Sequence, residues 1–190
     1  MRRLSFKPGL QVSGRKYKGL RGFAGKPFHP PLTDVPVVAY MFAAVFDIIS
    51  IAMPSGHDAV GRQLFLAATW TLFGGAGVSL LAALTGWADW HRSSEPGTQA
   101  RRTINAHALT MIAVTLLVLA DVLWRTVGHF DTSSTPIGIV ILSALSAALV
   151  AMGATLGGTL VFDYGFNVET AGDHPVWHKN EADVFPGQYQ

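Results

Sequence analysis

Long stretches without a charged residue dominate the pattern of hydrophobic and polar positions along this chain. Asp, Glu, Lys and Arg do not occur in residues 63–88, 103–120 or 132–162. A run of about 20 mostly apolar residues is long enough for a helix to cross the hydrocarbon core of a bilayer. The pattern therefore predicts four transmembrane helices, at roughly residues 36–53, 65–88, 107–124 and 136–162.

Two alternatives to a membrane bundle fit this pattern poorly. A helix of a soluble protein needs a polar face, and the second and fourth predicted helices have none. A membrane β-barrel needs strands in which apolar and polar residues alternate, and no such alternation occurs. Because the connecting segments are short, neighbouring helices should run antiparallel. We expect an all-α fold, an integral membrane up-down four-helix bundle in residues 31–166, between an arm of residues 1–30 and a tail of residues 167–190.

Small residues indicate where the predicted helices should pack, since small side chains let helix backbones approach closely in a membrane. They recur at every fourth position of the second and fourth helices, and the fourth helix also has a G-x-x-x-G pair. The expected packing residues are Thr71, Gly75, Ser79, Ala83, Ser143, Ala147, Ala151, Thr155, Gly153, Gly157 and Gly158. Thr135 and Pro136 are typical of an N-cap and a first helical residue, so they predict a sharp start for the fourth helix.

The composition narrows the possible chemistry, and the distribution of charge predicts an orientation. The chain has no cysteine, which excludes disulfides, thiolate catalysis and iron–sulfur ligation by its own side chains. Of the 14 Lys and Arg residues, eight precede the first predicted helix, three lie between the second and third, and one follows the fourth. The other two are Arg62 and Arg125. Because cationic loops stay in the cytoplasm, we expect both termini on the cytoplasmic side of a bacterial plasma membrane.

The first 30 residues carry eight cations and no acid. The simplest interpretation is a topology signal and a solvated arm on anionic lipid headgroups, where each cation gains about 1 kcal/mol. The alternative is a docking arm for an acidic partner. We expect no nucleic-acid partner, because Gly and Pro interrupt the basic residues and keep them from forming a row on a helix.

Asp47 is an acid inside the first predicted helix, near the middle of the membrane. A charge at that depth costs about 2.5–3.5 kcal/mol, so the side chain should face the bundle interior and have a partner. Asp121 of the third helix falls at a similar depth, and Arg125 lies roughly one turn farther out. The two are four residues apart, the spacing of an intrahelical pair. We expect these three residues to form an intramembrane polar cluster. The cluster either sets the register between helices or, since one Arg cannot neutralise two acids, takes part in proton or cation movement.

A second polar group is expected at the cytoplasmic ends of the helices, where all four helix ends meet. It comprises His29, Asp89, His91, His107 and Asp163. An ordinary interfacial histidine is the simplest interpretation of each imidazole. Two histidines at one depth on neighbouring helices can also hold the iron of a b-type haem, and His29 with His107 is the best such pair. No other metal site is expected.

The order of several short motifs resembles that of a known membrane family. The motifs are "GKPFHPPLTDVPV", an acid late in the first helix, "LLAALTGWADW", "RRTINAHALT" with Arg125 closing that helix, and "GATLGGTLVFDYGFNVE". The ordered set, over roughly residues 25–170, resembles the bacterial family catalogued as domain of unknown function 2231. The matching positions are His29, Pro30, Asp47, Gly86, Asp89, His107, Arg125, Gly157 and Gly158.

This resemblance implies a four-helix integral membrane domain and little about activity. Some members of the family are seen joined to Rieske-type iron–sulfur domains, which implies a place near respiratory electron transfer. Two positions depart from the family pattern. Lys26 and Thr159 stand where histidines are frequent in the family, and both losses argue against a metal or haem site in this chain.

Three hypotheses for the function follow. Since no nucleophile elbow, phosphate-binding loop or metalloprotease motif occurs, we do not expect an enzyme. The first hypothesis is an accessory or structural subunit of a membrane redox or respiratory assembly, in contact with lipid and with other membrane subunits. The alternatives are a proton or cation pathway through Asp47, Asp121 and Arg125, and a haem-binding electron carrier that uses His29 and His107.

Overall fold

The structure is a computed structural model that describes residue 20 and residues 27–168. Four helices make up most of this part: α1 is His29–Ile51, α2 is Asp58–Ser93, α3 is Gln99–Gly128 and α4 is Ile137–Phe162. All four are long and apolar enough to cross a membrane. The described residues contain no strand. The prediction of an all-α transmembrane four-helix bundle is confirmed.

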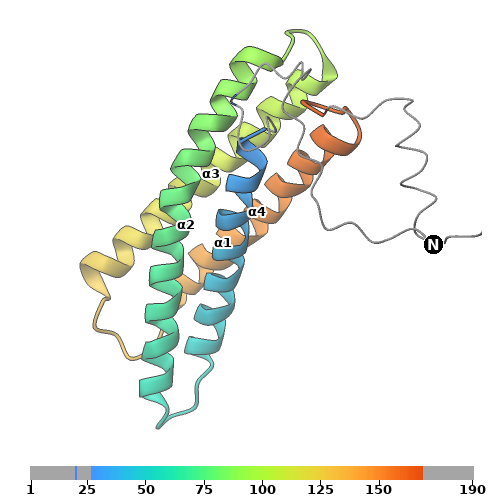
Figure 1. Cartoon of the computed structure of the whole chain (residues 1–190). Coiled ribbons are helices and arrows are strands. Elements are labelled where there is room, and N and C mark those ends of the chain that lie inside the picture. The colour runs from blue at the N-terminus through green and yellow to red at the C-terminus, as the bar shows by residue number, and fades with distance from the viewer. Residues whose placement is uncertain (1–19, 21–26, 169–190) are drawn as a thin grey trace, which may run out of the picture.

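Short loops join the four helices, which run up and down in turn (Figure 1). The α1–α2 and α3–α4 loops lie at one end of the bundle, named here the hairpin end. The start of α1, the α2–α3 loop and the end of α4 lie at the other, named the terminal end. Gly56 and Gly97 occupy turn positions with φ of +91° and +83°, which residues with a Cβ rarely adopt.

The four helices pack as two hairpins placed side by side. α1 packs mainly on α2, and α3 packs mainly on α4. Contacts between α1 and α4 and fewer between α2 and α3 join the hairpins. Glycines permit the closest approaches. A Cβ at Gly75 would lie 2.7 Å from the Cβ of Ala39, and one at Gly153 would lie 2.5 Å from the sulfur of Met111. The apolar core consists of Ala39, Tyr40, Ala43, Ala68, Leu72, Ala76, Val114, Val118 and Val150.

Three of the helices extend beyond the predicted membrane spans. α1 begins at His29, inside the predicted arm, because Pro30 and Pro31 suit a first helical turn whose N–H groups need no intrahelical acceptor. α2 has 36 residues and α3 has 30, which correspond to about 54 and 45 Å. Both exceed a hydrocarbon core of about 30 Å, so their ends reach beyond it.

The fourth helix differs from expectation in its start and in its buried face. Pro136, rather than Thr135, is the N-cap residue, because the hydroxyl of Thr135 turns inward to Asp47. The buried face consists of Ile139, Val140, Ser143, Ser146, Val150, Gly153 and Leu160. A strict four-residue ladder rotates by about 40° at each step around an α-helix. Ala151 and Thr155 of the predicted ladder are therefore exposed.

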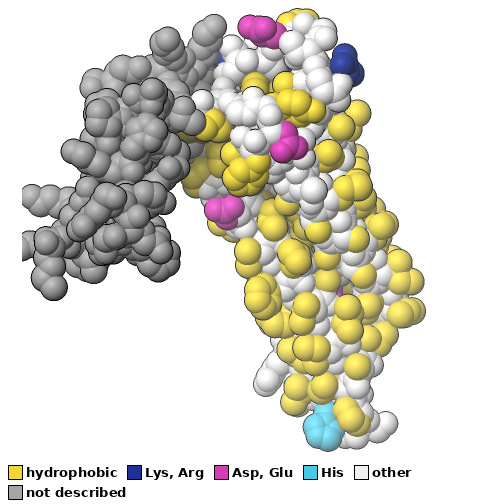
Figure 2. Space-filling model, turned by 90° about the vertical axis from the view of Figure 1, so that its right-hand side faces the viewer, with side chains coloured by type: hydrophobic (Ala, Val, Ile, Leu, Met, Phe, Trp, Pro, Cys, Tyr) yellow, Lys and Arg dark blue, Asp and Glu magenta, His cyan; other side chains and the backbone are white. Residues whose placement is uncertain are grey.

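The surface of the bundle suits a membrane. Figure 2 shows one flank, on which hydrophobic side chains cover the length of the helices while the charged ones lie toward the upper end. Large apolar side chains such as Leu84 and Leu116 are 63% and 62% exposed. A soluble bundle would not leave so many of them in water, whereas lipid tails accept them.

Part of what the sequence predicts lies outside the described residues. This holds for the arm up to residue 26, apart from residue 20, for the tail from residue 169, and for the lipid or acidic partner expected for the arm. The boundaries between arm, bundle and tail and the cytoplasmic placement of both termini stay predictions.

Candidate functional site

Asp47, Asp121 and Arg125 meet inside the bundle, toward the hairpin end. Asp47 comes from α1, and the other two residues lie on successive turns of α3. Each of the three side chains is 0% exposed. These three residues are named the ionic cluster below.

The guanidinium of Arg125 binds both carboxylates of the ionic cluster. Its Nε donates to Oδ1 of Asp121 at 2.9 Å, its Nη1 donates to Oδ1 of Asp47 at 3.0 Å, and its Nη2 donates to Oδ2 of Asp47. The ring of Phe65 lies on one side, 5.3 Å from the guanidinium carbon. Arg suits this position because its planar group presents five donors in a fixed geometry. The pairs join α1 to α3.

Hydroxyl groups from the other elements complete the surroundings of the ionic cluster. Thr69 of α2 accepts from Nη1 of Arg125 at 3.4 Å, and Thr135 of the α3–α4 loop donates to Asp47 at 3.0 Å. Ser143 of α4 lies between the two carboxylates. All four helices therefore meet here. Sequence reasoning did not assign these hydroxyls to the cluster, although Ser143 and Thr135 had been noted as a packing residue and a cap.

Ser143 has more acceptors around it than its one hydrogen can serve. Its Oγ accepts an N–H of Arg125 at 2.8 Å. Oδ2 of Asp47 lies 2.5 Å away, and Oδ2 of Asp121 and the carbonyl oxygen of Ile139 both lie 3.0 Å away. A hydroxyl donates one hydrogen only, so a further proton on one carboxyl would complete this contact. It would also balance two acids against a single guanidinium.

Further hydrogen bonds close the hairpin end over the ionic cluster. Ser50 donates to the carbonyl of Gly61 at 2.7 Å and accepts the N–H of Thr135 at 3.0 Å. Arg62 donates to the carbonyls of Phe130 and Thr132 at 3.1 and 3.2 Å. The α3–α4 loop is thereby held against α1 and α2.

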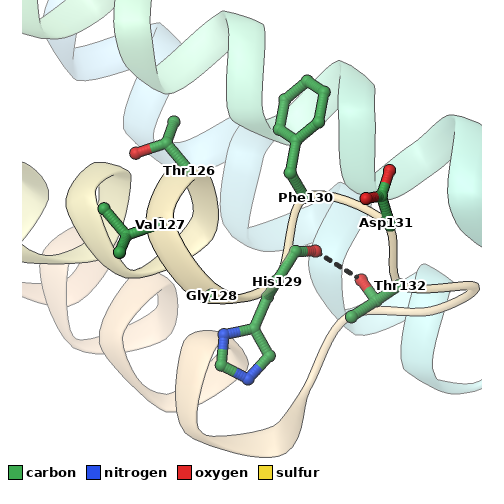
Figure 3. A pocket seen from close by; sticks show the side chains of 7 residues that line it. All are labelled: Thr126, Val127, Gly128, His129, Phe130, Asp131 and Thr132. Carbon is green, nitrogen blue, oxygen red and sulfur yellow. Dashed lines mark hydrogen bonds between the residues drawn. The ribbon is translucent and has the colours of Figure 1, made fainter.

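An open pocket of about 300 Å³ lies at the end of α3 and in the following loop (Figure 3). Residues 126–132 line it, and within it the hydroxyl of Thr132 donates to the carbonyl of His129 at 3.0 Å. The lining starts one residue after Arg125, but the three residues of the ionic cluster are not part of it. The pocket thus adjoins the cluster in sequence without opening onto its side chains.

His29 and His107 meet at the terminal end of the bundle and are named the histidine pair. Their ring centroids are 6.4 Å apart and their planes lie at 85°. Nδ1 of His29 lies 2.9 Å from the carbonyl oxygen of Ala82 on α2, and Nδ1 of His107 lies 2.8 Å from that of Gly153 on α4. A carbonyl oxygen can only accept, so each Nδ1 carries a hydrogen. Both side chains are partly buried.

The remaining residues of the predicted polar group at this end are divided between two environments. Asp89 is buried on α2, accepts the N–H of Leu20 at 3.3 Å, and is near enough for its charge to act on His29. His91 is exposed and packs edge-on against two tryptophan rings of α2. Asp163 is exposed at the end of α4. The structure therefore brings Asp89 to the histidine pair and leaves the other two residues facing outward.

Glycines border both rings of the histidine pair. A Cβ at Gly86 would lie 2.8 Å from Cε1 of His29, and one at Gly157 would lie 3.4 Å from Cε1 of His107. A Cβ at Gly158 would meet only Phe162 of its own helix within 4 Å. Gly157 therefore lies against α3, as expected of the packing residues, whereas Gly158 adds no contact between helices. Within the described residues, no group of three or more His, Cys, Asp or Glu could hold a metal ion.

A family model covers the whole of this bundle. The family described as "Predicted membrane protein (DUF2231)" matches residues 25–170. The chain belongs to this family. The resemblance carried by the ordered motifs is confirmed, and the DUF2231 match includes both the ionic cluster and the histidine pair. The family description states a membrane location and no activity. No curated protein and no solved structure matches the chain.

Proposed function

We propose that this DUF2231 protein exchanges a proton at the ionic cluster as part of proton movement across the membrane. The observation that supports the proposal is the contact of Ser143 with two buried carboxylates that share one guanidinium. Ionisable groups inside a membrane are costly, and they frequently mark ion or proton pathways.

The proposed step moves one proton between the two carboxyls through Ser143. A proton on Oδ2 of Asp121 passes to Oγ of Ser143 while the hydroxyl hydrogen of Ser143 passes to Oδ2 of Asp47. The number of protons is conserved, and the negative charge moves from Asp47 to Asp121. Arg125 contacts both carboxylates, so it stabilises the charge on either side of the step.

Buried hydroxyls continue from the ionic cluster toward the terminal end. Tyr40 lies seven residues before Asp47 on α1, about 10 Å along the helix axis. The hydroxyl of Ser146 is buried without a hydrogen-bond partner among the described residues, and that of Tyr40 is buried beside Ser79. Ser79 and Thr115 form a hydrogen bond of 3.3 Å between α2 and α3. Buried polar groups are nearly always hydrogen-bonded, so a core normally excludes hydroxyls that lack a partner. Hydroxyls between the ionic cluster and the terminal end therefore favour a proton path over a purely apolar barrier.

Proton flux into liposomes tests the proposal. The purified chain is reconstituted, a potassium diffusion potential is applied with valinomycin, and an internal pH-sensitive dye reports proton entry. We expect flux with the wild type and none with Asp121→Asn, because one carboxylate and one guanidinium then form a balanced pair without an exchangeable proton. Asp34→Asn, which changes an exposed acid of α1, is the matched control and should retain the flux.

The stability of Asp121→Asn makes this result decisive. The Asp47–Arg125 pair stays intact in this variant. We therefore expect its free energy of unfolding to lie within about 1 kcal/mol of that of the wild type. A folded variant that conducts protons like the wild type would overturn the proposal. A wild type that shows no flux under an applied potential would do the same.

A second candidate function is the accessory subunit of a membrane redox or respiratory assembly. It is favoured by the exposure of α3: in its apolar 18-residue stretch, 17% of the residues are buried, against 33–39% in the corresponding stretches of the other helices. Among the neighbouring helix pairs, α2 and α3 also pack least closely. A helix with this much free surface has room for a helix of another subunit, although lipid can cover it as well.

Purification from native membranes in mild detergent tests this candidate. We expect a tagged chain to retain a membrane partner with a redox cofactor, and Leu116→Trp on the exposed face of α3 to release that partner. The control is Ile141→Trp on α4, where the side chain is 59% exposed. Isolation of the wild type without any membrane partner would count against the candidate.

A further inference from the structure

Each ring of the histidine pair is held through one nitrogen and keeps the other for a ligand. Nδ1 of His29 donates to the carbonyl of Ala82, and Nδ1 of His107 donates to that of Gly153. In a neutral imidazole whose Nδ1 carries the hydrogen, Nε2 keeps its lone pair. Histidines that bind metals are oriented in this way, by donation from the second nitrogen to a carbonyl or carboxylate. The fold therefore prepares two Nε2 lone pairs, one on α1 and one on α3.

The separation of the two rings corresponds to ligands of one shared metal. Two metal–nitrogen bonds of about 2 Å, with about 1 Å from each nitrogen to its ring centre, place the ring centres about 6 Å apart. The observed distance is 6.4 Å. Edge-to-face contact between rings covers the same range. The two Nδ1 hydrogen bonds favour a shared metal over a simple edge-to-face contact. A ring contact alone does not require both rings to be fixed through Nδ1.

The number of protein ligands favours a metal that brings ligands of its own. A structural zinc site has four protein ligands and a catalytic zinc site has three. The described part of the chain contains no cluster of three or more His, Cys, Asp or Glu around a common point. Haem iron needs only two axial ligands from the protein, because the porphyrin supplies the other nitrogens.

Glycines let both rings of the histidine pair lie close to the backbones of neighbouring helices. Gly86 and Gly157 present no side chain to the imidazole rings. Of the neighbouring helices, α2 and α3 pack least closely, and α3 carries His107. A macrocycle between the two imidazoles would lie between α1 and α3, which do not pack directly against each other.

We infer that His29 and His107 bind the iron of a b-type haem through their Nε2 atoms. The inference concerns binding and rests on the histidine pair alone. The ionic cluster lies 18 residues farther along α1, about 27 Å away. Proton exchange at the cluster and haem binding at the pair can therefore fail separately.

Titration with hemin tests the inference on the full-length chain in detergent. The visible spectrum is recorded in the oxidised form and after reduction with dithionite. We expect one hemin per chain and a low-spin, six-coordinate spectrum with a narrow α band on reduction. His29→Ala and His107→Ala should each remove that spectrum and weaken hemin binding by at least about tenfold. His91→Ala, an exposed histidine of the same end, is the control and should leave both unchanged.

Three results would overturn the inference. One is a folded wild type that binds no hemin. Another is hemin binding that is equal in the wild type and both alanine variants, which indicates adventitious binding to an apolar surface only. The last is tight binding of Zn²⁺ or Cu²⁺ in place of hemin and its loss in the alanine variants, which indicates a bare-ion site. His107→Met keeps an axial ligand that haem iron accepts, so it should bind hemin with a shifted spectrum and excludes misfolding as the cause.

Discussion

At the hairpin end of the bundle, every member of the ionic cluster is fully buried and bound by side chains of the same fold. At the terminal end, each member of the histidine pair is partly buried and bound through one of its two nitrogens. Both sites draw on all four helices, yet the ionic cluster is bound on every side by groups of the protein, whereas each imidazole of the histidine pair keeps one nitrogen for a ligand. An enclosed cluster that is short of one hydrogen suits a proton and the alignment of helices, whereas an open nitrogen suits a ligand from outside.

The two sites should also respond differently to substitution. Removing the only cation of the ionic cluster leaves buried carboxylates without compensation, which costs about 3–5 kcal/mol in typical buried pairs. Removing an imidazole from the histidine pair breaks about one neutral hydrogen bond, worth about 1 kcal/mol. Damage to the hairpin end should therefore appear as lost stability, and damage to the terminal end chiefly as lost ligand binding.

Arg125→Ala should have the largest effect and tests the comparison most severely. It leaves two acids buried without a guanidinium, so we expect a loss of about 3–5 kcal/mol, or failure to accumulate in the membrane. Thermal unfolding in detergent measures the loss. The control is Arg62→Ala, which loses an exposed ion pair with Asp131 at 3.7 Å and two hydrogen bonds to loop carbonyls, and which should cost only about 1–2 kcal/mol. Equal stability of the two variants would remove the distinction between the ends.

Asp47→Asn and Asp121→Asn sharpen the description of the ionic cluster. Asp47 accepts hydrogen bonds from Arg125, Thr135 and Ser143 and joins different elements, while Asp121 pairs mainly within its own helix. We expect Asp47→Asn to be less stable than Asp121→Asn by about 1–2 kcal/mol. Chemical or thermal unfolding of both variants measures the difference. If Asp121→Asn were the less stable variant, the hydrogen bonds of Asp47 to other helices would not be its main contribution to stability.

Gly86→Ala tests the packing at the terminal end, where Gly86 lies against His29. Its Cβ would lie 2.8 Å from Cε1 of His29, so the ring has to move, at a cost of about 1–3 kcal/mol. Gly74→Ala of the same helix is the control, since a Cβ there meets nothing within 4 Å and should leave the protein equally stable or stabilise it by about 0.5–1 kcal/mol. Unfolding temperature and hemin binding are measured together. Unchanged values in both variants would show that the close approach of Gly86 to His29 is unimportant.

Thr135→Val should give the smallest effect. The hydroxyl of Thr135 donates to Asp47 at 3.0 Å, so its removal should cost about 1 kcal/mol. Thr132→Val removes a partly buried hydroxyl of the same loop that bonds only a backbone carbonyl, and it should cost less. Differential scanning calorimetry of the two variants compares the loss of a contact within the loop with the loss of a contact to the ionic cluster. A larger loss of stability for Thr132→Val would mean that the contact within the loop matters more than the contact between Thr135 and Asp47.

Several features of both sites followed from the sequence without any tertiary information. Apolar length predicted the four helices, and the short connecting segments predicted their alternating directions. Counting residues along a helix placed Asp47 and Asp121 at one depth, and the four-residue spacing placed Arg125 beside Asp121. The same counting brought His29 and His107 to one level. Depth and face within a single helix depend on local geometry, which is why they could be predicted.

Other features depended on how the helices are rotated against one another. Only the packed bundle shows that Ser143 of α4 lies between the two carboxylates and that Thr135 leaves the start of α4 to bind Asp47. Asp163 was expected beside the histidine pair, but the end of α4 carries it outward.

The sequence by itself determined that this chain forms four transmembrane helices, with two acids at a common depth in the membrane and an arginine about one turn from one of them. The tertiary structure decided which hydroxyls surround those residues and which carbonyls orient the histidine pair. The physical reason is that an α-helix repeats every 3.6 residues, so a sequence fixes positions around each helix axis. The rotation of one helix against the next depends instead on close approaches such as those at Gly75 and Gly153, which only packing determines.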